Sequence, residues 1–207
     1  MTVTIDRGAA LKEWAAVVKA LESGTQVLIL RKGGIREEGF SAEAAAFFFY
    51  PTGFHQTTDK LRSEHIHFME EAMADRPPEG RVRIRSMAQT AGVFAVPDED
   101  KLASLAGEYV YTVDEMKKRH EFRPGDSLTA LAVRVYILKQ PAEILLKTNY
   151  GGCVSWVHLE DPVSTEGAKP VLSDDAFDQR LRRIRDILSP RSHPSMDSAG
   201  VPPSNRS

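Results

Sequence analysis

The sequence lacks the features of disulfide-rich, membrane-spanning and strongly basic proteins. Its single cysteine, Cys153, excludes an internal disulfide and any metal site built from several thiolates. No stretch approaches the roughly 18 consecutive apolar residues that cross a membrane, and residues 1–8 contain no apolar signal core. The formal net charge of −2 argues against a protein that coats nucleic acid through bulk charge. We therefore expect a cytoplasmic protein without a membrane partner, in which any contact with nucleic acid is local.

The composition is that of an ordinary globular domain followed by a polar tail. With 207 residues, 42% of them hydrophobic, the chain can bury one core of normal size. We predict a single domain over residues 1–188. Residues 189–207 are rich in Pro and Ser and offer almost nothing to bury, which predicts a disordered tail.

Hydrophobic periodicity predicts a mixture of helices and strands. Apolar residues at helical spacing predict helices over residues 11–21, 58–74, 98–106, 113–120 and 177–188. Short aromatic or β-branched runs predict strands over residues 27–30, 35–40, 47–50, 81–85, 109–111, 128–138 and 152–159. Thr112 and Glu115 have the spacing of a capping box at the start of the fourth helix. This order predicts an α+β fold, with a central mixed, mainly antiparallel sheet or open barrel flanked by helices.

The segment LILRKGGIREEGF, residues 28–40, is the first candidate for a binding site. Its two cations precede a glycine pair, and the loop FYPTGFHQTT, residues 49–58, leads into the second predicted helix. If these strand ends meet on one side of the sheet, the cations, the glycine amides and the helix N-terminus all favour an anion. The predicted ligand contacts are Arg31, Lys32, Gly33, Gly34, His55 and Gln56. The alternative is a hairpin turn, in which the glycines only supply positive φ.

A strictly alternating strand supplies a second group of cations. Arg81, Arg83 and Arg85 fall on one face of the strand 81–85, where guanidinium groups could extend the site along a phosphate backbone. The alternative is a charged strand face that discourages edge pairing. The arginine-rich last helix has the same two interpretations.

An enzyme is the competing class. His55 would act as general acid or base, with Glu38 or Glu37 as its orienting partner or as a metal ligand, in a hydrolase or nuclease. A third class, a protein–protein adaptor, would show an apolar patch around Phe54 and the aromatic strand.

Metal and thiol chemistry have little support in the sequence. His65 and His67 lie two apart on a predicted helix and project in different directions, so they cannot chelate one ion together. Cys153 precedes a predicted strand, which favours a buried structural thiol. We predict no metal site and assign no cofactor.

Several separate blocks resemble a known family. They are EWAAVVKAL at 13–21, LRKGGIREEGF at 30–40, FFYPTGFHQ at 48–56, RVYIL at 134–138 and YGGCVSWVHL at 150–159. Together they are similar to a bacterial family called domain of unknown function 1802, over most of residues 10–190. That resemblance implies no activity.

A weaker resemblance concerns layout. SGTQVLILRKGGIREE, followed later by FRPGDSLTALAVRVYIL, is similar to small RNA-associated β-barrels of the PUA and ASCH kind. Gln26 stands where those domains usually have lysine, and the glutamate of this segment comes later in the sequence than it does in those domains. The resemblance implies an RNA partner. Together with the cations, it leads us to predict a phosphate-bearing ligand, with RNA, DNA or a nucleotide as the favoured class.

Overall fold

The computed structural model describes residues 5, 8–32, 46–53, 56–122, 128–152 and 154–189. Within these residues the strands are β1 (Ala9–Trp14), β2 (Leu28–Lys32), β3 (Ala46–Thr52), β4 (Arg81–Val96), β5 (Leu128–Leu145), β6 (Trp156–His158) and β7 (Lys169–Pro170). The α-helices are α1 (Ala15–Glu22), α2 (His67–Ala74), α3 (Glu99–Ser104), α4 (Val113–Glu121) and α5 (Asp174–Leu188). The 3₁₀ turns are η2 (Thr58–Lys60), η3 (Ser63–His65), η4 (Ala106–Glu108) and η5 (Thr148–Tyr150).

The described strands form one mixed sheet. Its order is β2-β5-β4-β3-β1-β6, and β7 also pairs with β5. The pair β1–β3 is parallel, whereas the other pairings are antiparallel. The outer strands β2 and β6 do not pair with each other within the described residues, so the sheet is open. The predicted α+β fold with a mixed, mainly antiparallel sheet is confirmed.

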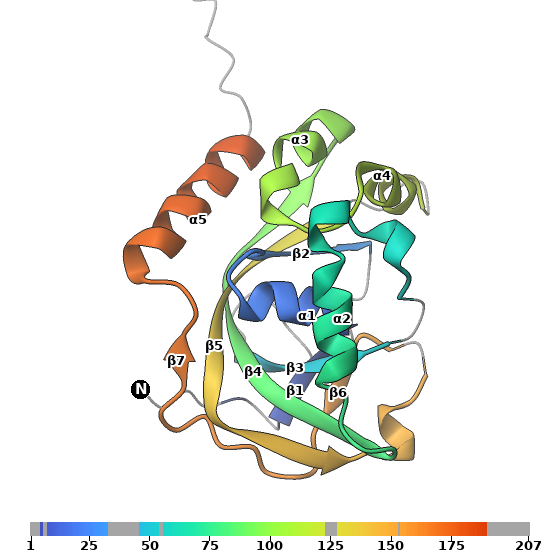
Figure 1. Cartoon of the computed structure of the whole chain (residues 1–207). Coiled ribbons are helices and arrows are strands. Elements are labelled where there is room, and N and C mark those ends of the chain that lie inside the picture. The colour runs from blue at the N-terminus through green and yellow to red at the C-terminus, as the bar shows by residue number, and fades with distance from the viewer. Residues whose placement is uncertain are drawn as a thin grey trace, which may run out of the picture.

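The long strands β4 and β5 run the whole length of the molecule as two curved ribbons (Figure 1). Alternate side chains of the sheet belong to two separate hydrophobic clusters. Phe47 and Phe49 of β3 pack in the larger cluster with α1, α4 and α5, whereas Phe48 and Tyr50 pack in the smaller one on the other face. The sheet is therefore buried on both faces over its middle part.

The predicted helix over residues 11–21 is wrong in its first half. Residues 9–14 form β1, which pairs with β3 on one side and β6 on the other, and the helix begins only at Ala15. Leu11 and Trp14 fit both a helical and a strand pattern, and the pairing with two distant strands decides between them.

Two other predicted elements also need correction. The predicted helix over residues 58–74 is divided into η2, η3 and α2, because Leu61 leaves the helical path to form a bridge with Tyr111. That bridge is the whole of the strand predicted over residues 109–111. The strand predicted over 152–159 shortens to β6, while β5 extends the strand predicted over 128–138 as far as Leu145. The strand predicted over 35–40 and the tail beyond Ser189 lie outside the described residues.

Candidate functional site

Arg31, the first cation of the predicted site, is held inside the fold. Its guanidinium donates a hydrogen bond to the carboxylate of Glu13 at 3.1 Å and another to the backbone carbonyl of Lys12. The side chain of Glu13 is 7% exposed and that of Arg31 is 17% exposed. A carboxylate buried this deeply is strongly destabilising without a cation beside it. Arg31 therefore has a structural role.

Next to this ion pair lies a group of aromatic and cationic side chains. The Arg119 guanidinium of α4 lies 4.1 Å from the centre of the Tyr111 ring and 4.9 Å from that of the Trp14 ring. The Lys60 ammonium of η2 lies 5.2 Å from the centre of the Trp14 ring. We call this group the Trp14 cluster, and it consists of Glu13, Trp14, Arg31, Lys60, Tyr111, Glu115 and Arg119.

The residues of the Trp14 cluster come from β1, β2, η2, α4 and the bridge residue Tyr111. Trp14 is the last residue of β1 and the N-cap residue of α1, so its side chain projects where the sheet gives way to the helix. The side chain of Thr112 accepts a hydrogen bond from the Glu115 amide and starts α4. The Thr112 amide donates to the Lys60 carbonyl at 2.9 Å, which fastens η2 to the start of α4. The cations around Trp14 are therefore positioned by hydrogen bonds at the start of α4, one of which joins residues far apart in the sequence.

The surroundings of Arg119 in the Trp14 cluster favour its charged form. Burial acts to lower the pKa of Arg119, but the influence of Tyr111 and the hydrogen bond to Glu115, 2.8 Å away, outweigh it and raise that pKa. Burial also raises the pKa of Tyr111, so its hydroxyl keeps its proton and donates to the Glu13 carboxylate at 3.5 Å. The cations outnumber the two carboxylates of the cluster, and Trp14 remains partly exposed. Such a group attracts an anion that has a flat apolar part.

Lys32 and Gln56, two further predicted contacts, already have partners in the fold. The Lys32 ammonium donates to the His120 carbonyl in the last turn of α4. The Gln56 side-chain oxygen accepts a hydrogen bond from the Ala16 amide at 2.9 Å, and its nitrogen lies 2.8 Å from the sulfur of Met69. Gln56 thus caps the first turn of α1, rather than standing at the N-terminus of the helix after it.

The remaining residues predicted around this loop lie outside the described residues. They are Gly33, Gly34, Glu37, Glu38, Phe54 and His55, together with Cys153. The hydrolase interpretation, which depends on His55 with Glu38 or Glu37, therefore stays a prediction. The aromatic strand beside Phe54 is buried at Phe47, Phe48, Phe49 and Tyr50.

The predicted arginine strand lies at the other end of the molecule. Arg31 pairs in register with Thr129 at the start of β5, whereas Arg83 pairs with Glu143 near its end. Arg83 also forms ion pairs with Asp75 at 2.5 Å and Glu143 at 2.6 Å. Arg85 lies 3.3 Å from Asp75, and Arg81 is exposed. The structure therefore does not bring these three arginines to the Trp14 cluster.

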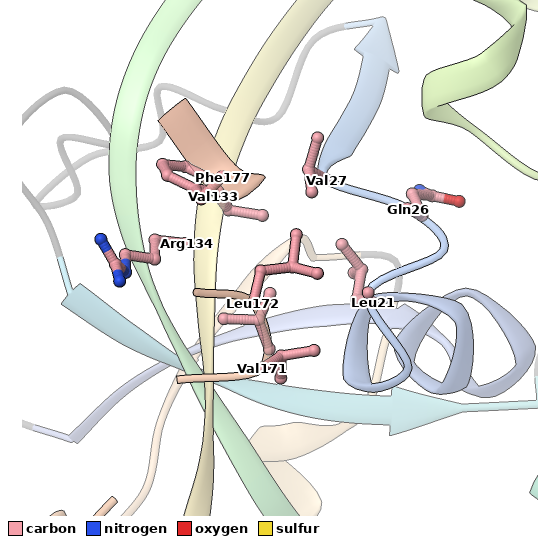
Figure 2. Close-up of a pocket in the computed structure, with 10 residues that line it drawn as sticks. Leu21, Gln26, Val27, Val133, Arg134, Val171, Leu172 and Phe177 are labelled. Atoms are coloured by element: carbon pink, nitrogen blue, oxygen red, sulfur yellow. The ribbon is translucent and has the colours of Figure 1, made fainter. Parts of the chain in front are cut away.

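Two hollows in the structure do not suit an anionic ligand. Leu21, Val27, Val133, Val171 and Leu172 converge on a space of about 10 Å³, and Arg134 extends to the other side of β5 (Figure 2). This space has room for about one water molecule. An open hollow of about 490 Å³ lies beside Phe48 and residues 159–166, and its lining carries carboxylates of Glu160, Asp161 and Glu166. That lining repels a phosphate.

Two further observations concern metal ions and membranes in the described part of the chain. No group of three or more His, Cys, Asp or Glu side chains there could hold a metal ion. None of the helices described above is long and apolar enough to cross a membrane.

The sequence did not indicate the residues at the centre of the Trp14 cluster. The sequence pattern predicts Trp14 on the apolar face of a helix and Tyr111 in a short strand. Lys60 and Arg119 lie among many other cations, and nothing in their local sequence marks them. A capping box at Thr112 was the one signal in the sequence that pointed to the position of Arg119.

The structure is that of an α+β protein with an open, curled sheet and a cluster of cationic and aromatic side chains at one end. Residues 10–183 match the family described as domain of unknown function (DUF1802). The chain therefore belongs to this family, as its sequence blocks indicated.

Three crystal structures of the ASCH protein from Zymomonas mobilis are similar to this chain. The unmutated protein and one mutant each have a TM-score of 0.43 and 19% sequence identity, and cover 86% of this chain and 95% and 97% of their own. A second mutant has a TM-score of 0.41 and 17% identity, and covers 84% of this chain and 95% of its own. A comparison with curated proteins gives no match.

Proposed function

We propose that this protein binds nucleic acid, and that the Trp14 cluster is its binding site. The observation that carries the proposal is the placement of two cations, Lys60 and Arg119, on the ring of one partly exposed indole. Cations bind phosphate oxygens, and an aromatic face binds a base or a sugar. A nucleic acid offers both groups in one ligand.

Only some of the ligand contacts that the sequence predicts are kept in this proposed site. Arg31 belongs to the cluster, and Lys32 follows it at the end of β2. Gly33 and Gly34 come next in sequence, and His55 precedes Gln56, so we keep these three as proposed ligand contacts. We leave Arg81, Arg83 and Arg85 out of the proposed site, because they lie on β4 opposite the far end of β5. The layout shared with RNA-associated domains makes RNA the first ligand to test.

A salt series tests the proposal. Binding of labelled single- and double-stranded RNA and DNA is measured by fluorescence anisotropy from about 50 mM to about 200 mM salt, with the parent protein and Lys60→Ala. We expect affinity to fall as salt rises, because bound cations release counterions from phosphate. Lys60→Ala should weaken binding to every sequence and make the slope of log affinity against log salt less negative by about 0.7 to 0.9.

The matched control is Lys169→Ala, which removes an exposed lysine from β7. This variant should bind like the parent at every salt concentration. Absence of salt-dependent binding by the parent would overturn the proposal. Equal losses of affinity in the two lysine variants would show that only the overall charge matters. The Trp14 cluster would then not be the binding site.

A further inference from the structure

We infer that the ligand of the Trp14 cluster is single-stranded, with one unpaired base stacked on the Trp14 ring and the Lys60 ammonium moved from that ring to a phosphate. This inference rests on the proposed function and adds the class of nucleic acid and the role of each side chain.

One side of the Trp14 cluster is fixed. The Tyr111 ring meets the Trp14 ring edge to face, with their centres 5.4 Å apart and their planes at 67°. Tyr111 is 1% exposed, and Arg119 is held against it by Glu115 at 2.8 Å. A ligand therefore meets Trp14 as part of a preformed surface, and binding does not have to order Tyr111 or Arg119 first.

Lys60 is the cation of the cluster that a stacking ligand would displace. It belongs to a 3₁₀ turn of three residues, and its ammonium reaches the indole through a long, flexible stem. The contact is electrostatic, and a base that stacks on the ring replaces it. The displaced ammonium then lies beside the bound strand, where a phosphate becomes its new partner.

The same geometry disfavours a duplex. Bases inside a double helix stack on each other and expose only their edges, so the Trp14 face has nothing to stack against. A duplex is held instead by many phosphate contacts at once. The Trp14 cluster provides few cations, and Arg31 and Arg119 are already paired with Glu13 and Glu115. Base stacking is therefore the main interaction by which the Trp14 cluster can bind nucleic acid.

Intrinsic fluorescence tests the stacking directly, because the chain has two tryptophans. Trp156 is 4% exposed and packs edge to face on Phe47, with the ring centres 5.1 Å apart. Trp156→Phe leaves Trp14 as the reporter, and Trp14→Phe leaves Trp156. We expect a mixed-sequence 12-nucleotide RNA strand to quench the first protein and leave the second unchanged. The same strand annealed to its complement should quench neither.

A pair of substitutions then separates stacking from packing. Trp14→Leu keeps an apolar side chain without a ring, whereas Trp14→Phe keeps a ring. Binding to the single strand should fall about tenfold in Trp14→Leu and much less in Trp14→Phe. Circular dichroism verifies that each variant is folded. If Trp14→Leu does not fold, the fluorescence of the Trp156→Phe protein decides the question.

The outcomes distinguish this inference from the proposed function. Salt-dependent binding with equal affinity for strand and duplex, and with unchanged Trp14 fluorescence, would overturn the inference and leave the proposed function supported. Failure of the parent protein to bind any of the probes would overturn both.

Discussion

Arg31 and Glu13 form an ion pair at 3.1 Å, although their strands stand four places apart in the sheet order β2-β5-β4-β3-β1-β6. A flat sheet would hold these strands far apart, since neighbouring strands are about 4.8 Å from each other. The curvature of β4 and β5 brings β2 round to the end of β1 (Figure 1). The ion pair therefore closes the curled sheet on the side where its edge strands, within the described ranges, do not pair with each other.

The first prediction concerns this closure. Arg31→Met leaves the Glu13 carboxylate buried without its cation, and should lower the free energy of unfolding by about 3 to 5 kcal/mol. The double variant Glu13→Gln/Arg31→Met should lose much less, because no charge is then left unpaired. Urea denaturation at neutral pH measures both. Arg81→Met, which changes an exposed arginine, is the control, and an equal loss in Arg31→Met and this control would contradict the prediction.

The second prediction concerns the attachment of α5. Arg180 holds the Glu108 carboxylate at 2.6 Å and donates to the carbonyls of Gly24 and Thr25, and Glu108 is 2% exposed. Arg180→Leu should therefore destabilise the protein by about 3 kcal/mol or more, measured by thermal or urea unfolding. Arg182→Leu, at an exposed position of the same helix, should change stability by less than about 0.5 kcal/mol. Similar losses in both variants would show that the ion pair is not what anchors α5.

The third prediction is a dependence of stability on pH. Burial acts to raise the pKa of Asp75, but hydrogen bonds from Lys19 and Arg83 outweigh it, so this pKa lies below its ordinary value of 3.8. The contribution of Asp75 to stability is therefore present above about pH 3.8, and is lost as the pH falls through the lower pKa of the folded state.

Asp75→Asn tests this dependence. The variant should be less stable than the parent at neutral pH, and its free energy of unfolding should fall less between about pH 4 and about pH 2. Asp100→Asn, at an exposed position of α3, should keep the profile of the parent. If the stability of Asp75→Asn fell with acid in parallel with that of the parent, the loss would not come from Asp75.

The fourth prediction concerns the start of α4. The Thr112 side chain accepts a hydrogen bond from the Glu115 amide at 3.2 Å. Thr112→Ala should cost about 1 kcal/mol, and Thr112→Ser, which keeps the hydroxyl, should cost less. Since α4 carries Arg119, Thr112→Ala should also weaken nucleic-acid binding if that proposal holds. Chemical denaturation and anisotropy measure the two effects, and unchanged stability in Thr112→Ala would show that the cap contributes nothing.

Elements with strong local signals could be predicted from the sequence. The β-branched run in β5, the Thr112 cap of α4 and the amphipathic pattern of α5 each depend on neighbouring residues, and each element appears as predicted or longer. Local energetics alone favour one structure in these segments.

The Trp14 cluster could not be predicted, because its residues depend on distant pairing. Trp14 changes from an expected helical core residue to the end of a strand because residues 46–52 lie beside it in the sheet. In the same way, the sequence predicts that the charge of Arg31 is available to a ligand. In the fold, the Glu13 carboxylate lies 3.1 Å from the Arg31 guanidinium. No local pattern connects these two residues, since the contact exists only when the sheet curls.

The order of the strands also has a consequence for the rate of folding. Leu28 pairs with Ala132 and Leu11 pairs with Trp156, so both edges of the sheet wait for segments made much later in the chain. Closing such long loops costs chain entropy before any contact repays it. We therefore expect the domain to fold in about milliseconds to seconds rather than microseconds. The curvature that builds the Trp14 cluster is thus achieved late, and in a newly made chain β2 and the side of β1 that faces β6 stay unpaired until then.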